Sequence, residues 1–93
     1  MEFEWDFAKE LANIAKHGCT FAEAVDTFRD PRGIMIVDGS HSKAEERFYW
    51  VGKSQNGLVL TVRFTRRGNK IRIFGCAEWR KFRRIYDEAA KNG

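Results

Sequence analysis

The chain has few of the residues that cross-link or stiffen small domains, with two cysteines and one proline among 93 residues. Cys19 and Cys76 lie 57 positions apart, and neither belongs to a CxxC pair or to a Cys/His cluster at metal-ligand spacing. A structural zinc site is therefore not supported. Two isolated thiols are typical of a reducing cytosol, so we expect both cysteines to be buried and unbridged in a cytoplasmic protein.

Long apolar segments are absent too. No run approaches the roughly 18–20 apolar residues that cross a bilayer, and the acidic, amphipathic start differs from the basic-then-apolar pattern of a secretory signal. We therefore expect no membrane partner. Aromatic residues are plentiful instead, and eight Phe, three Trp and two Tyr can supply a core. A chain of this length buries about two-thirds of its unfolded surface, which predicts a single domain over residues 1–93.

Positive charge is concentrated in the last third of the chain. Residues 1–62 hold seven Lys/Arg against ten Asp/Glu, whereas residues 63–93 hold ten against three. Seven of the nine basic residues between Arg63 and Arg84 are arginine, whose planar guanidinium suits phosphate. Because aromatic side chains are interleaved with them, a nucleic-acid partner is favoured over other acidic partners. The alternative is a solvated surface with no partner.

Hydrophobic periodicity predicts an α+β fold. Helices are expected at residues 7–16, 20–28 and 78–91, and strands at residues 2–5, 34–37, 47–53, 58–66 and 70–76. Asp6 is a candidate helix N-cap, Thr20 with Glu23 forms a capping box, and Gly18 is a helix C-terminal stop. Turns or loops are expected at residues 30–33, 38–42, 55–57 and 67–69. We therefore expect helices packed on one face of a mainly antiparallel sheet, with a C-terminal helix.

Alternation within the strands separates two faces of this sheet. In the strand at residues 58–66, Leu58, Leu60, Val62 and Phe64 share an apolar face, whereas Arg63 points the other way. A two-residue turn at residues 68–69 would pair Phe64 with Ile73 and place Arg72 on the same side as Arg63. We therefore expect an apolar face against the helices, and an opposite face that presents arginines on rigid strands, as contact with phosphate requires.

Four strings of residues carry a resemblance to a known family. They are Phe3-x-Trp5-Asp6-x-x-Lys9-x-x-x-Asn13-x-x-Lys16-His17-Gly18, Asp38-x-x-His41-Ser42-x-x-Glu45-Glu46-Arg47, Arg67-Gly68-x-x-Ile71-Arg72-Ile73, and Trp79-Arg80-Lys81 with Tyr86. In this order and at these separations, they resemble the BrnT family of type II toxins over almost the whole chain.

The resemblance implies a RelE-like fold and a ribonuclease toxin that cuts RNA such as mRNA, either without sequence preference or on the ribosome. Such a cut would inhibit translation and growth, and it would use no metal or other cofactor. The implied partner is a BrnA-like antitoxin encoded beside the toxin. Its DNA-binding half would repress the shared operon, so that this chain would reach DNA only through the antitoxin.

The catalytic residues that we expect are mostly arginines. RNA cleavage by the 2′-hydroxyl needs a proton acceptor, positive charge on the pentavalent phosphorus, and an acid for the leaving oxygen. Arg72 and Arg67, inside a matched string, are expected to supply the charge, with Arg80 as a supporting contact. His17 is the candidate acid or base, because imidazole exchanges protons near neutral pH. Alternatively, His17 only closes its helix.

Further contacts with RNA are expected from a second group of basic residues, namely Lys16, Arg63, Arg66 and Lys81. Here the chain departs from the family pattern, because many members have Ser-Ala-Arg where this chain has Gly75-Cys76-Ala77. We expect Arg80 or Lys81, one helical turn later, to replace the missing basic residue. For Lys16, a solvated helix face is the alternative.

Two other classes of function remain open from the sequence. A non-catalytic nucleic-acid-binding module would need only the basic hairpin and the last helix. An interaction protein would use its arginines only to dock an acidic antitoxin. A neighbouring gene for a ribbon-helix-helix protein would favour the ribonuclease toxin over the binding module, and toxicity in the absence of that neighbour would distinguish it from both.

Overall fold

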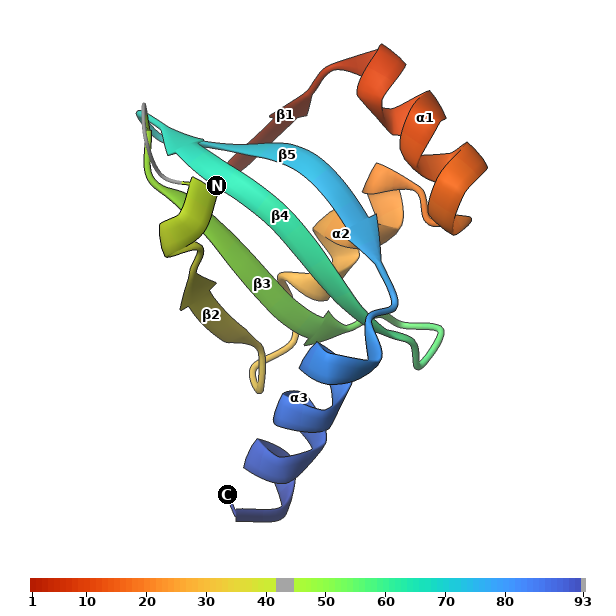
Figure 1. Ribbon diagram of the computed structural model, residues 1–93, viewed down its shortest axis with the longest axis vertical. Helices are drawn as coiled ribbons and strands as arrows, with labels where there is room; N and C mark the ends of the chain where they lie inside the picture. Colours follow the sequence, from red (N-terminus) through yellow and green to blue (C-terminus); the bar gives the residue numbers. More distant parts are fainter. Residues whose placement is uncertain (42–44, 93) are drawn as a thin grey trace.

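The computed structural model describes residues 1–41 and 45–92 (Figure 1). Its elements are β1 (Glu2–Trp5), α1 (Phe7–His17), α2 (Phe21–Thr27), β2 (Ile34–Val37), η1 (Gly39–His41), β3 (Arg47–Lys53), β4 (Val59–Arg67), β5 (Lys70–Ala77) and α3 (Arg80–Asn92). Every predicted helix and strand is present, with bounds that differ from the prediction by at most two residues. The predicted loop at 38–42 contains the short 3₁₀ helix η1, and its Ser42 lies outside the described residues.

The capping residues that the sequence predicts are present at the ends of α1 and at the start of α2. The Asp6 carboxylate accepts a hydrogen bond from the backbone N–H two residues later, at 2.8 Å. Gly18 adopts a left-handed conformation (φ 72°), and its N–H donates to the carbonyl of Ile14. Thr20 and Glu23 form both bonds of the capping box. These contacts satisfy backbone groups that the helix ends would otherwise leave without partners, so the short connection between α1 and α2 is well defined.

The sheet has five strands in the order β1-β5-β4-β3-β2. The β3–β4 and β4–β5 pairs are antiparallel, as the turns at residues 55–57 and 67–69 predicted. The β2–β3 pair is antiparallel as well, and β1 adds to the free edge of β5 in parallel. The α+β class with a mainly antiparallel sheet is thus confirmed, and the first strand closes one edge of it.

A β-bulge interrupts the pairing of β4 with β5. Phe64 pairs with Ile73, as predicted, but Arg63 pairs with Gly75, so Phe74 is an extra residue on β5. A bulge of this kind bends its strand and re-aims the side chains beside it. The displaced side chain is here an aromatic ring in the middle of the basic segment.

The two faces of the sheet carry different helices. On one face α2 packs against the apolar side chains of β3, β4 and β5, and this core contains Cys19, Phe21, Ala24, Phe48, Leu60, Val62, Phe64, Ile71, Ile73 and Cys76. On the other face, Tyr86 and Phe82 of α3 pack on Val51 and Val59. The sequence predicts helices on one face of the sheet, and α2 packs as expected. Helix α3 packs on the opposite face instead, because the sheet carries apolar side chains there as well. The two buried cysteines are unbridged, as predicted.

Helix α1 is tied to the sheet edge by a buried asparagine. The Asn13 amide donates to the carbonyls of Cys19 and Cys76, both at 2.9 Å, and its oxygen accepts from the N–H of Cys76 at 3.0 Å. These three bonds fix one side of α1 against the end of β5. Across residues 1–41 and 45–92, no helix is long and apolar enough to span a membrane.

Candidate active site

A cavity of about 360 Å³ opens between α1 and the face of the sheet that α2 does not cover. Its lining residues come from α1, β3, β4 and β5, and they are Lys9, Ala12, Asn13, Lys16, His17, Arg47, Arg63 and Phe74. Three residues predicted for the site, Lys16, His17 and Arg63, therefore lie around one hollow. We call it the cationic cavity.

Positive groups dominate this cavity. Two lysines, two arginines and one histidine line it, and its described lining contains no Asp or Glu. Like charges brought this close repel one another unless an anion lies between them. In the described part of the chain, no three His, Cys, Asp or Glu side chains gather as ligands of a metal ion would. An anion in the cavity would offset this repulsion, and a phosphodiester has the matching charge and oxygen atoms.

Phe74, the extra residue of the bulge, organises two of the cations. The Lys9 ammonium lies 4.9 Å and the Arg47 guanidinium 4.5 Å from the centre of its ring. Such cation–π contacts are each worth about 0.5–1 kcal/mol at partly exposed sites. The ring therefore offsets part of the repulsion between two cations that come from different elements, and it holds both at the cavity.

Arg63 reaches the cavity across a glycine. A Cβ atom at Gly75 would lie only 2.6 Å from a terminal nitrogen of Arg63, so the guanidinium occupies the space that any larger residue would fill. The same guanidinium lies 6.0 Å from the ring of Trp79. Among the described residues, the contacts of Arg63 are thus with a backbone and an aromatic ring, and no ion pair of Arg63 with an acid is seen.

His17 ends α1 beside the same tryptophan. Its imidazole meets the Trp79 ring edge-on, with ring centroids 6.2 Å apart, and it lines the cavity with Arg63. An imidazole next to bound phosphate is placed to give or take a proton. His17 thus lines the cationic cavity at the end of α1, a position compatible both with proton exchange and with the sequence alternative of a helix-closing residue.

Tyr49 pairs with Arg63 across β3 and β4 and is a second group able to exchange a proton. Burial raises the pKa of Tyr49, and the hydrogen-bonded carboxylate of Asp38 raises it further, while Arg63 opposes them. The phenol is therefore protonated at neutral pH. Burial also raises the pKa of both cysteine thiols, which leaves them poor nucleophiles.

Arg67 and Arg72, predicted to be catalytic, lie toward the β4–β5 hairpin and already face carboxylates. Arg72 binds Glu4 of β1 at 3.1 Å, and Glu4 also lies 3.8 Å from Lys70. Arg67 lies 3.5 Å from Glu45. Neither arginine lines the cationic cavity, although Arg72 is only two residues from Phe74 along the strand. We call these contacts the hairpin ion pairs.

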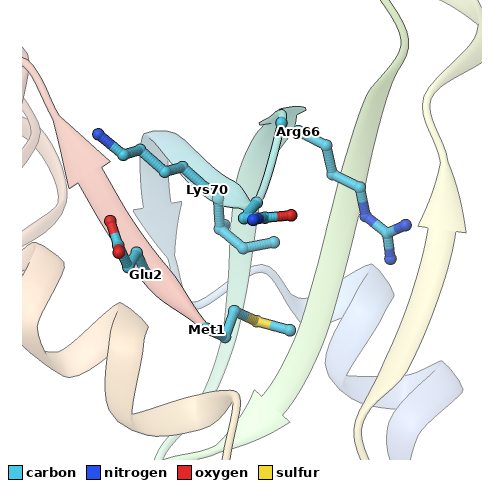
Figure 2. A pocket seen from close by; sticks show the side chains of 7 residues that line it. Met1, Glu2, Arg66 and Lys70 are labelled. Atoms are coloured by element: carbon cyan, nitrogen blue, oxygen red, sulfur yellow. The ribbon is translucent and has the colours of Figure 1, made fainter.

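The remaining predicted residues lie elsewhere. Arg66 extends from the opposite face of β4 and lines a separate hollow of about 560 Å³ with Met1, Glu2 and Lys70. Figure 2 shows Arg66 and Lys70 extending to opposite sides of it. Arg80 is exposed at the start of α3, and Lys81 lies over the ring of Phe82 at 5.5 Å. The predicted set is thus divided among four places.

The site residues predicted from the sequence do not include Lys9, Arg47 and Phe74, which line the cationic cavity. The seven-residue spacing of Lys9 and Lys16 already put them on one side of α1, but it could not show that this side meets a bulge on β5. The signal that could have identified Lys9 and Arg47 was their presence in the matched strings. Alternation places Phe74 on the same side as Arg72 and Arg63, and Phe74 lines the cavity with Arg63, but alternation could not show the bulge that makes Phe74 an extra residue on β5.

The completed site can be compared with known proteins. A family model described as the ribonuclease toxin BrnT of type II toxin–antitoxin systems matches residues 5–82. No curated protein matches the chain. Among solved structures, the ribonuclease toxin BrnT of Brucella abortus is similar with a TM-score of 0.65 and 23% sequence identity. That match covers 85% of this chain and 96% of the Brucella chain, and at this identity it shows the fold.

Proposed function

The chain belongs to the BrnT family of ribonuclease toxins of type II toxin–antitoxin systems, and we propose that it cuts RNA in the cationic cavity. The family supplies RNA as the substrate class and an antitoxin as the partner. The observation that carries the location is the lining itself, in which Lys9, Lys16, Arg63 and an imidazole converge and the described part contains no carboxylate.

The reaction that fits this cavity is transesterification by the 2′-hydroxyl of the RNA. The 2′-oxygen attacks phosphorus, the bond from phosphorus to the 5′-oxygen breaks, and the products are a 2′,3′-cyclic phosphate and a 5′-hydroxyl. One proton leaves the 2′-oxygen and one reaches the 5′-oxygen. Arg63 and the lysines stabilise the charge that develops on the phosphate, and His17 performs one of the proton transfers. These roles need no metal ion.

The sequence prediction gives the reacting phosphate to Arg67 and Arg72, with Arg80 supporting. That assignment stays a prediction, and the geometry favours Arg63 over it. A guanidinium already bonded to a carboxylate contributes less charge to a phosphate and must first release its partner. Arg67 and Arg72 each face such a carboxylate.

The biological part of the proposal follows the family. Cleavage of mRNA, free or on the ribosome, stops translation and growth in the cytoplasm. A BrnA-like antitoxin, encoded next to this chain, binds it and connects it to DNA. A matching neighbour gene, and growth arrest on induction that the neighbour relieves, would support this part.

The deciding experiment uses purified chain and two RNA oligonucleotides. One is all ribose, and the other carries a single 2′-deoxy residue at the mapped cut. We expect cleavage of the first in the presence of EDTA, with a 2′,3′-cyclic phosphate end, and no cleavage of the second at that position. Binding of both RNAs without cleavage would identify a binding module instead, and loss of cleavage in EDTA would refute metal independence.

A further inference from the structure

Trp79 contacts two residues of the cationic cavity from outside it. Its ring lies 6.2 Å from the imidazole of His17, centroid to centroid and nearly perpendicular, and the Arg63 guanidinium lies 6.0 Å from its centre. Trp79 itself is not among the described residues that line the cavity. His17 ends α1 and Arg63 lies on β4, so one side chain on the connection between β5 and α3 connects residues from two distant segments.

The backbone of Trp79 is fixed by the start of α3. Its carbonyl accepts hydrogen bonds from the N–H groups of Phe82 at 3.1 Å and Arg83 at 3.0 Å. Trp79 directly precedes α3, so these are the first bonds of the helix and Trp79 occupies the N-cap position. The place of its ring therefore follows from the point where α3 begins.

Two further rings support the indole from the side of the core. The rings of Tyr49 and Phe82 lie 6.2 Å and 6.0 Å from that of Trp79, and 4.8 Å from each other. Aromatic rings at such separations attract one another. Phe82 in turn packs on the small core beneath α3. The indole is thus anchored to the folded body of the chain, and its other contacts extend to the cavity.

Arg63 needs support of this kind. An arginine side chain loses much rotational freedom when it is held in one place, and among the described residues no ion pair with an acid is seen to hold Arg63. Gly75 leaves the space that the guanidinium occupies, because a Cβ there would lie 2.6 Å from one of its nitrogens. The Trp79 ring supplies the attraction, as aromatic rings do for cations.

We propose that Trp79 is a positioning residue for RNA cleavage, whose indole holds the Arg63 guanidinium and the His17 imidazole in the geometry that the reaction needs. The inference rests on the proposed function, which gives Arg63 the charge on the phosphate and His17 a proton transfer. Trp79 contacts no reacting atom. An aromatic ring suits this task, because a carboxylate would hold the same groups but would also offset the charge that the phosphate must meet.

A direct contact with RNA is the other role that a tryptophan beside such a cavity could have, since bases stack on aromatic rings. The place of Trp79, outside the described lining and in contact with Arg63 and His17, favours positioning. The two roles predict different kinetics. Loss of a stacking contact weakens RNA binding and raises KM, whereas loss of a positioning contact lowers kcat with little change in KM.

The test compares cleavage by the intact chain carrying Trp79→Leu or Trp50→Leu. Both tryptophans are half-buried, but Trp50 stacks on Phe28 against the core that α2 covers. We expect Trp79→Leu to lower kcat about tenfold or more, because a misplacement of about 1 Å has an effect of this size, with KM little changed. Trp50→Leu should keep the wild-type kcat. Trp79→Phe retains a ring and should restore most of kcat. Each variant is assayed well below its melting temperature.

A second readout does not depend on cleavage. The chain has two histidines, and the ring of Trp79 shifts the NMR signals of imidazole protons held beside it. We expect the His17 signals to move toward those of an unfolded chain in Trp79→Leu and to stay in place in Trp50→Leu. Unchanged His17 signals in Trp79→Leu would overturn the proposal.

The outcomes separate this inference from the proposed function. A higher KM with unchanged kcat in Trp79→Leu would overturn the positioning role and identify a contact with RNA. In a chain that already carries Arg63→Ala, Trp79→Leu should cost less kcat than in the wild type, and an equal loss would overturn the action through Arg63. A wild-type chain that cuts no RNA would refute the proposed function, and the His17 signals would then decide alone whether Trp79 holds the cavity.

Discussion

The cationic cavity and the hairpin ion pairs lie on one sheet and carry the same kinds of basic residue, yet they differ in what faces each guanidinium. At the hairpin, Arg72 and Arg67 meet Glu4 and Glu45. At the cavity, Arg63 meets Gly75 and the ring of Trp79. Local density of arginine therefore does not distinguish the two regions. What distinguishes them is whether the fold has already supplied a carboxylate to the guanidinium.

The largest expected effect is on RNA cleavage. Arg63→Ala should lower the cleavage rate by about 10²–10³, as loss of one preorganised donor typically does. Arg67→Ala should change it only a few-fold, because Arg67 is half-exposed beside Glu45. Rates are measured with purified variants whose melting temperatures match the wild type. The reverse result, with Arg67 essential and Arg63 dispensable, would restore the site predicted from the sequence.

A second prediction concerns the hydrogen bond between Tyr86 and Asp30, which belongs to neither of these two regions. The Tyr86 hydroxyl donates to the carboxylate of Asp30 and so ties α3 to the turn before β2. Tyr86→Phe should lower the free energy of unfolding by about 1.5–3 kcal/mol, the range for hydrogen bonds to charged groups. Chemical denaturation at neutral pH measures this. Cleavage by the folded variant should be unchanged.

The same pair predicts how stability depends on pH. Burial and Asp30 raise the pKa of Tyr86 to about 12, above the value of about 10 in an unfolded chain. The stabilisation of the folded state by the protonated Tyr86 hydroxyl is therefore complete below about pH 10 and is lost as the pH rises toward 12. Burial alone would raise the pKa of Asp30, but hydrogen bonds from Tyr86 and two backbone N–H groups lower it. The Asp30 contribution is therefore lost in acid. Tyr86→Phe should weaken both dependences, and parallel curves for both proteins would contradict the assignment.

The fold could largely be predicted from the sequence because local chemistry set its elements. The cap at Asp6, the stop at Gly18 and the turn at residues 68–69 each specify backbone geometry through a few adjacent atoms. The parallel pairing of β1 with β5 could not be predicted. It joins residues about 70 positions apart, and no local signal records which edge a short first strand joins.

The residues of the cationic cavity could be predicted only in part, for the same reason. Arg63, Lys16 and His17 were identified by residue type, but their convergence depends on the Asn13 contacts that hold α1 against β5. Arg72 was assigned to catalysis because alternation gives its face, and alternation says nothing about Glu4 on a distant strand. The sequence therefore did not indicate which basic side chains form ion pairs with carboxylates on remote segments.

A third prediction sharpens the contrast by moving Arg63 without removing it. Gly75→Ala places a methyl group against the Arg63 guanidinium, whose flexible end must then shift. A displacement of about 1 Å can cost a large part of a rate enhancement, and we expect roughly a tenfold slower cleavage with little change in stability. The control is Gly39→Ala, where an added Cβ meets nothing within 4 Å.

The double variant decides whether Gly75 acts through Arg63. If it does, Arg63→Ala with Gly75→Ala should cleave no more slowly than Arg63→Ala alone. Additive losses would show instead that the methyl group disturbs the cavity by another route, such as the bulge at Phe74.

The smallest expected effect is on the stability that the hairpin ion pairs supply. Arg72 and Glu4 are 3.1 Å apart with side chains 25% and 29% exposed, so water still screens them. Ion pairs near the surface contribute about 0–1 kcal/mol, and removal of the arginine leaves Glu4 near Lys70. Arg72→Ala should therefore lower the melting temperature by a few degrees, and less at high salt, where screening acts over a shorter distance. Lys70→Ala, with its longer contact, should lower it less. A loss of several kcal/mol would mean that the pair anchors β1, and loss of cleavage with intact stability would mean that Arg72 leaves Glu4 to bind the phosphate.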